Sequence, residues 1–316
     1  NTTGADNIAV GENSLLSNTT GGSNTAIGNF ALDANTTADN NTAVGKAALG
    51  ANTTGVNNVA LGHSAVDANT TGVNNVGLGT NALSANTTAE ANTAVGTNAL
   101  MVNTTGAYNV AVGMSALDAN TTANDNTAVG TNSLGANTTG TKNTALGKDS
   151  GLAITTGNQN TALGARSLQA TTTADHNTAI GEATLYANTT GASNTAVGSQ
   201  SLAANTTASH NTAVGKNALT ANTTGNTNTA FGSRALQTNT TGDRSTAVGF
   251  QALATQNPAA NADINNTAMG YNAGTSVTTG ISNTAIGSES LAANTTGSEN
   301  TVVGKDAMVD NTTGGS

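Results

Sequence analysis

The chain has very little of several residue types, and each shortage narrows what the protein can be. Its 316 residues include no cysteine, no tryptophan and one proline, and aromatic residues make up 2% of the total. The lack of cysteine fits an extracellular protein that needs no disulfides. Charged residues make up 8% of the chain, against about 25% in an ordinary soluble domain. Asn, Thr, Ser and Ala must therefore cover most of the surface.

The charged residues that are present do not gather into a basic stripe. The formal net charge is −9, and the 8 Lys and Arg residues are scattered singly along the chain. A nucleic-acid partner is not expected, because binding one requires clustered cations to neutralise phosphates. No apolar run approaches the roughly 20 residues of a spanning helix, and no amphipathic basic helix is visible. The sequence therefore predicts no membrane span in this segment.

What the chain does have is a repeat of 17 residues. The segment Asn41–Gly45 (Asn-Thr-Ala-Val-Gly) returns as Asn92–Gly96, Asn126–Gly130 and Asn211–Gly215. A fixed period of this length is typical of stacked repeat proteins, in which length adds coils rather than separate cores. We expect one repeat domain over residues 1–316. Because the chain begins and ends within a repeat, we also expect it to be a segment of a longer protein.

Positions in the repeat are counted from its first Asn, so that Asn41 is position one. Positions two and four share a face if the segment is a strand. Position four is always apolar and is expected to face the interior, while the small residues at positions three and five leave a smooth outer face for a second subunit. Position nine, usually Leu, and position eleven, usually Ala, suggest a second short strand, and Asn-Thr-Thr-Gly suggests a turn. The predicted core columns include Val44, Leu49, Val95, Leu100, Val129 and Leu134.

The charged residues test this reading of the repeat. Lys and Arg occur only at positions six, seven and seventeen; Lys46, for example, is at position six. Nearly all acids occur at positions six, seven, ten, sixteen and seventeen; Asp33, for example, is at position ten. Charges are costly to bury, so these positions are expected at turns or outward-facing sites. Glycines and Thr-Thr pairs disfavour a helix, and disorder gives no reason for apolar columns. We predict an all-β parallel β-solenoid (β-roll) of about eighteen coils of 17 residues.

Two kinds of irregularity interrupt the repeat. Two coils carry Gly at position nine and an apolar residue at position twelve instead, Gly151 with Ile154 and Gly274 with Val277. We interpret each as a core refilled from the turn. A four-residue insertion within residues 254–265 contains the single proline and is expected to form a surface loop.

Phe250 and Tyr271 both occupy position six of successive coils, so they are expected to be neighbours on the outside. Such a pair could stack on a sugar or a partner, although single exposed aromatics are also common on protein surfaces. They are the candidate surface-contact residues.

Other kinds of site find little support. The recurring Asn-Thr-Thr triplets match the N-glycosylation pattern, but glycans about 4.8 Å apart could not all fit, so a buried asparagine ladder is favoured. Columns of Thr suggest ice binding as a hypothesis. However, the Thr at position two shares a face with apolar position four, and that face is expected to point into the core. His63, His176 and His210 have no clustered metal ligands. No catalytic constellation is present, so we expect neither an enzyme nor a cofactor.

The strand Asn-Thr-Ala-Val-Gly with a small residue three positions on, as in Gly147-Lys148-Asp149-Ser150, resembles the head repeats of trimeric autotransporter adhesins. Those heads carry a similar Ser-Val-Ala-Ile-Gly strand, and similar repeats occur in phage tail fibres. The resemblance implies left-handed parallel β-rolls joined as trimers. It transfers no individual binding residue.

The sequence thus predicts a non-enzymatic extracellular or cell-surface protein that serves as a structural fibre or adhesin, for attachment or filament formation. The expected partners are further copies of the chain, as a homotrimer or a filament, and a cell-surface or matrix ligand. The alternatives are a phage tail-fibre shaft and an ice-binding β-solenoid.

Overall fold

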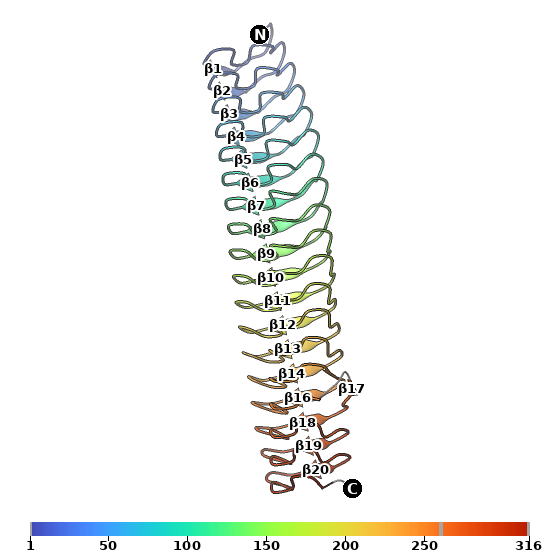
Figure 1. Ribbon diagram of the computed structural model, residues 1–316. Helices are drawn as coiled ribbons and strands as arrows, with labels where there is room; N and C mark the ends of the chain where they lie inside the picture. Colours follow the sequence, from blue (N-terminus) through green and yellow to red (C-terminus); the bar gives the residue numbers. More distant parts are fainter. Residues whose placement is uncertain (1, 259–261, 315–316) are drawn as a thin grey trace. The chain divides into compact units, whose positions relative to one another are not determined.

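The computed structural model describes residues 2–258 and 262–314. It contains two compact units, Asn1–Asn158 and Gln159–Ser316, which are described separately. Within each unit, short parallel strands lie one above the next, joined by turns and bends (Figure 1). The described residues contain no helix, so they include no helix long and apolar enough to cross a membrane. Each unit is a stretch of the parallel β-solenoid that the repeat predicts.

Nearly every strand is three residues long and begins at position two of its coil. Those of the first unit are β1 (Ile8–Val10), β2 (Thr25–Ile27), β3 (Thr42–Val44), β4 (Val59–Leu61), β5 (Val76–Leu78), β6 (Thr93–Val95), β7 (Val110–Val112), β8 (Thr127–Val129) and β9 (Thr144–Leu146). Those of the second unit are β10 (Thr161–Leu163), β11 (Thr178–Ile180), β12 (Thr195–Val197), β13 (Thr212–Val214), β14 (Thr229–Phe231), β15 (Gly242–Asp243), β16 (Thr246–Val248), β17 (Ala262–Asp263), β18 (Thr267–Met269), β19 (Thr284–Ile286) and β20 (Thr301–Val303).

The strands pair in register with the strands of the next coil. In the first unit Thr42 lies beside Val59 and Val44 beside Leu61. The same register holds in the second unit, where Val214 lies beside Phe231. Identical repeat positions are therefore stacked into columns, spaced by the strand separation of about 4.8 Å.

The strand faces the opposite way from the prediction. Position three is the buried one, and Ala43 has no exposed surface, whereas Val44, Val95 and Val129 are only half-buried and point outward. These three valines are therefore not core residues, and that part of the prediction is wrong. Positions two and four do share a face, as period-two alternation requires, but it is the outer face.

The strand buries position three because of the side chains on the opposite wall of the coil. The position-nine side chain of one coil packs beneath position three of the next, so that a Cβ added at Gly77 would lie 2.5 Å from Val66 Cγ2. Position three is therefore Ala or Gly in every coil but the last, which carries the buried Val302 there, and the larger position-four side chain is left outside. Leu49, Leu100 and Leu134 are fully buried, as the sequence predicts.

Positions six to eleven form turns rather than the predicted second strand. The leucines at position nine adopt left-handed backbone, with φ 51° at Leu49 and 50° at Leu100. Left-handed backbone costs a non-glycine residue roughly 1–2 kcal/mol, while full burial of Leu contributes about 1.5–3 kcal/mol. Burial therefore offsets the strain. Position five needs glycine, because Gly45 has φ 135° and an added Cβ would lie 2.4 Å from the carbonyl oxygen of Gly62.

Two columns of buried asparagine line the interior, and they confirm the predicted ladder. At position twelve, Asn69 Nδ2 donates to Asn52 Oδ1 at 2.7 Å and to the Gly72 carbonyl at 3.0 Å. At position one, the Asn75 backbone N–H donates to Asn58 Oδ1 at 2.9 Å. Buried polar groups need such partners. Because these amides have no exposed surface, the folded coils leave no room for glycans on them.

The irregular coils behave as the sequence predicts where the structure describes them. Ile154 and Val277 are fully buried, and Gly151 and Gly274 have φ 58°. A Cβ at Gly151 would lie 3.1 Å from Ile154 Cδ1, so the side chain from position twelve occupies the space of the missing leucine. In the insertion, residues 259–261 lie outside the described residues. Beyond them β17 pairs in parallel with β15.

Candidate interaction surfaces

The outward side chains of the three-residue strands form the largest regular surface of each unit. We call positions two and four of these strands the strand face. Position two is Thr in most coils and Val or Ile in the rest, and position four is aliphatic, Phe or Met throughout. The strand face carries no charged side chain.

Much of the strand face is open to solvent. At position four, Leu61 is 53% exposed, Phe231 55% and Met269 49%. Most of the valines at this position are half-buried. Scattered exposed apolar residues are normal, but a continuous apolar surface marks an interaction site. Since the register repeats from coil to coil, the exposed aliphatic side chains form one continuous column in each unit. This surface could not be predicted while position four was expected to lie in the core.

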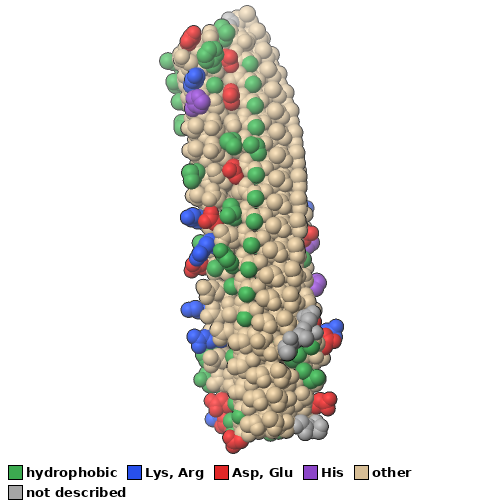
Figure 2. All heavy atoms as spheres, viewed as in Figure 1, with side chains coloured by type: hydrophobic (Ala, Val, Ile, Leu, Met, Phe, Trp, Pro, Cys, Tyr) green, Lys and Arg blue, Asp and Glu red, His purple; other side chains and the backbone are tan. Residues whose placement is uncertain are grey.

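The charged side chains lie off the strand face. In Figure 2 a narrow column of small apolar side chains runs along the face turned to the viewer, with several Asp and Glu side chains beside it and most Lys, Arg and His side chains toward the margins. Lys46 at position six is exposed, as the sequence predicts for turn positions. The surface thus divides into an apolar strand face and a polar, sparsely charged remainder.

The predicted contact pair does come together in the second unit. The rings of Phe250 and Tyr271 stack with their centroids 5.6 Å apart and an interplanar angle of 11°. They are 40% and 52% exposed. Each ring packs one of its faces against the other ring, and such stacking of aromatic side chains is favourable. The pair lies at position six, two residues beyond the strands β16 and β18, and so borders the strand face.

A small acidic pair lies at position ten of the first unit. A Cβ added at Gly50 would lie 2.7 Å from Asp67 Oδ1 and 3.5 Å from Asp33 Oδ1, so the two carboxylates approach each other over this glycine. Burial raises the pKa of Asp67, the Asp33 carboxylate raises it further, and His63 acts in the opposite direction. Burial also raises the pKa of Asp33. Among the described residues, no group of three or more potential ligands could hold a metal ion.

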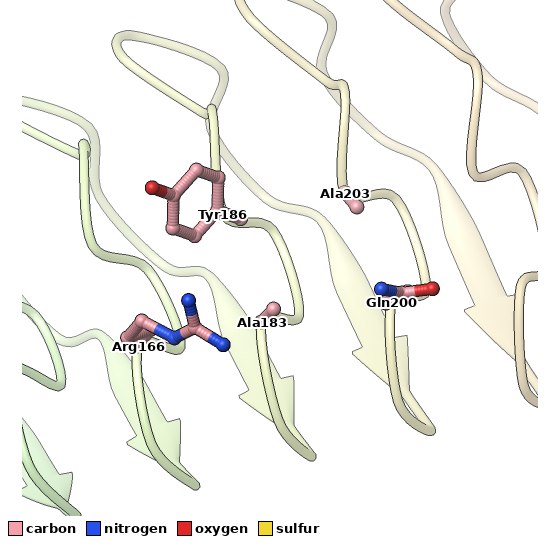
Figure 3. Close-up of a pocket in the computed structure, with 5 residues that line it drawn as sticks. All are labelled: Arg166, Ala183, Tyr186, Gln200 and Ala203. Carbon is pink, nitrogen blue, oxygen red and sulfur yellow. The ribbon is translucent and has the colours of Figure 1, made fainter.

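The second unit also contains a shallow hollow that the sequence analysis did not anticipate. It has a volume of about 340 Å³ and is lined by Arg166, Ala183, Tyr186, Gln200 and Ala203. Figure 3 shows Ala183 between Arg166 and Gln200, and Ala203 beyond Tyr186 on the coil that carries Gln200. The lining residues come from positions seven and ten of successive coils. The available signal was the coincidence of Tyr and Arg at those positions beside Ala.

No family model matches the chain, and no curated protein matches it either.

Proposed function

We propose that the protein is a non-enzymatic structural fibre protein of the cell exterior, in which copies of the chain associate along their strand faces. The fibre would carry an attachment function for a cell surface or matrix. The observation that carries the proposal is the uncharged, exposed aliphatic column of the strand face. An apolar column of this kind is stabilised by burial, and a second copy of the chain offers an identical column.

The size of the strand face supports an interface between copies. About nine coils in one unit, spaced by about 4.8 Å, give a face on the order of 40 Å long, and three residues with their side chains give a width on the order of 12 Å. Two such faces together would bury on the order of 1,000 Å² per unit, which reaches the lower bound for a specific interface.

Three copies are the preferred assembly. The repeat resembles those of trimeric adhesin heads, and a threefold arrangement lets each strand face contact both neighbours around a common axis. The charged turn positions would then remain at the outside, where charges are best solvated.

Sedimentation of the full chain tests the proposal. The intact chain is expected to sediment with three times the chain mass, and a variant with Val95→Glu, Val112→Glu and Val129→Glu is expected to sediment as a single chain. The three valines point outward, so the variant should keep its fold. Buried carboxylates without partners are costly at an interface.

The matched control places the same charges beside the strand face. Thr97, Met114 and Thr131 lie at position six of the same three coils. Their replacement by Glu should leave the threefold mass unchanged. A single-chain mass for the unaltered protein over the whole accessible concentration range contradicts the proposal.

Ice binding is the second candidate, because one observation now favours it. From the sequence it was only an alternative, because the position-two threonines were expected to face the core with position four, but in the structure both positions lie on the outer face. Exposed threonines in register could order water. However, Phe231 and Met269 break the flatness of the face. Thermal hysteresis in the single-chain Glu variant and in the unaltered chain decides the matter, since only an ice-binding protein shows it and the added carboxylates would abolish it.

A further inference from the structure

We propose that the hollow around Tyr186 binds a pyranose sugar. The hollow is in the second unit and is lined by residues at positions seven and ten, which are not part of the strand face. The proposal does not depend on the assembly proposed above.

The shape of the hollow follows from the side chains of successive coils. Ala183 and Ala203 provide a low floor because they stand in columns where other coils carry larger residues, such as Gln200 and Tyr186. The volume of about 340 Å³ is at the small end of the range for ligand pockets. A single sugar ring fits such a volume, whereas an extended peptide would not.

The chemistry of the lining matches the two kinds of surface on a pyranose ring. Tyr186 is 41% exposed and presents an aromatic ring against which the C–H face of a sugar can pack. Tyr combines a large apolar body with a polar hydroxyl, which suits a partly wet site. The ring is rigid, so little conformational entropy is lost on binding.

Planar polar groups surround the ring and can bond sugar hydroxyls. Arg166 Nη2 donates to Glu182 Oε1 at 2.9 Å, and this bond uses one of the five guanidinium N–H groups. The Gln200 amide can both donate and accept. Because the Glu182 carboxylate offsets the charge of Arg166, the site favours a neutral sugar over an acidic one.

Saturation-transfer NMR on the full chain tests the proposal, with the methyl pyranosides of glucose, galactose, mannose and N-acetylglucosamine as probes. At least one should receive saturation, most strongly at the protons of one ring face, with a dissociation constant in the millimolar range. Tyr186→Ala should weaken binding by about tenfold or more, whereas Tyr186→Phe should retain most of it. Sorbitol, which has hydroxyl groups but no rigid apolar face, should receive none.

Tyr271→Ala is the matched control, because this tyrosine is exposed to a similar extent and belongs to the stacked pair. It should leave binding unchanged, and circular dichroism should show that every variant keeps the fold. Absence of transfer to all four pyranosides overturns the proposal. So does binding that survives Tyr186→Ala, binding that is lost with Tyr271→Ala instead, or equal transfer to sorbitol. None of these results bears on the sedimentation test of self-association.

Discussion

The buried asparagines show how a single residue type holds the coils together. In most coils the interior carbonyl at position fifteen accepts from the position-twelve asparagine of the same coil, as Gly106 does from Asn103 at 2.9 Å. The side-chain oxygen of the same asparagine accepts a hydrogen bond from the next coil, where Asn120 Nδ2 donates to Asn103 Oδ1 at 2.8 Å. The ladder replaces the large apolar core that this thin coil lacks.

Removing one rung of the ladder should be costly. Asn103→Ala leaves Asn86 Oδ1 without the donor that it has at 3.3 Å, and a buried unsatisfied group costs about 1–3 kcal/mol. The exposed Thr105→Ala in the same coil should change stability by no more than about 0.5 kcal/mol. Chemical unfolding followed by circular dichroism measures both. Equal midpoints for the two variants would show that the ladder contributes nothing.

The acidic pair gives a pH dependence with a definite sign. The pKa of Asp67 is raised in the folded protein, mainly by burial, so the folded state binds its proton more tightly than the unfolded state. Its stabilising contribution is full below the unfolded pKa of about 3.9 and is lost as the pH rises through the raised value. Asp67→Asn should therefore raise the melting temperature at pH 7 and have little effect at pH 3.

The exposed Asp125→Asn serves as the control for this experiment and should leave the melting temperature nearly unchanged at both pH values. A melting temperature that falls in the Asp67→Asn variant at pH 7 would mean that the carboxylate is stabilising. That result would contradict the burial argument.

At the scale of the coil, the repeat period, the parallel strands, the asparagine ladder and the leucine column could all be predicted from the sequence. These features depend on spacing and residue type alone. The facing of the strand could not, because Thr-Ala-Val alternates equally well in either direction. What decides it is the position-nine side chain from the far side of the coil, which leaves little room at position three, so that small residues such as Ala43 and Gly77 predominate there. The left-handed backbone of the position-nine leucines could not be predicted either, since this conformation is rare for Leu.

The coil with Gly151 and Ile154 allows a direct test of how position nine and position twelve share the interior. Gly151→Leu alone should destabilise the first unit by about 1–3 kcal/mol through overpacking, because its Cβ would lie 2.9 Å from Leu134 Cδ2. Ile154→Asn alone should also destabilise it, by opening a cavity.

The double variant should recover the stability that each single change loses. It restores the leucine column and supplies a donor for Asn137 Oδ1, a buried oxygen with no partner among the described residues. The φ of 58° at residue 151 already matches that of the other leucines. A double-mutant cycle on chemical unfolding measures the coupling. Additive losses would contradict the shared-space account.

At the scale of the whole molecule, the division of the surface is what gives the protein its proposed role. Charges are few and none lies on the strand face, which repeats through each unit. This uncharged face is the basis of the proposed self-association. The candidate contact pair Phe250 and Tyr271 was found from sequence because equal repeat positions stack. The hollow around Tyr186 was missed because it depends on how large and small side chains combine across three successive coils.

The most direct test of the account is maleimide labelling of single cysteines, which the cysteine-free chain permits. Ala94→Cys and Val95→Cys are compared in the unaltered background and in one carrying Val112→Glu and Val129→Glu. We expect Ala94→Cys to stay protected in both backgrounds, and Val95→Cys to be protected in the first and labelled in the second. Rapid labelling of Ala94→Cys in the folded chain, or of Val95→Cys in the unaltered background, would contradict the account.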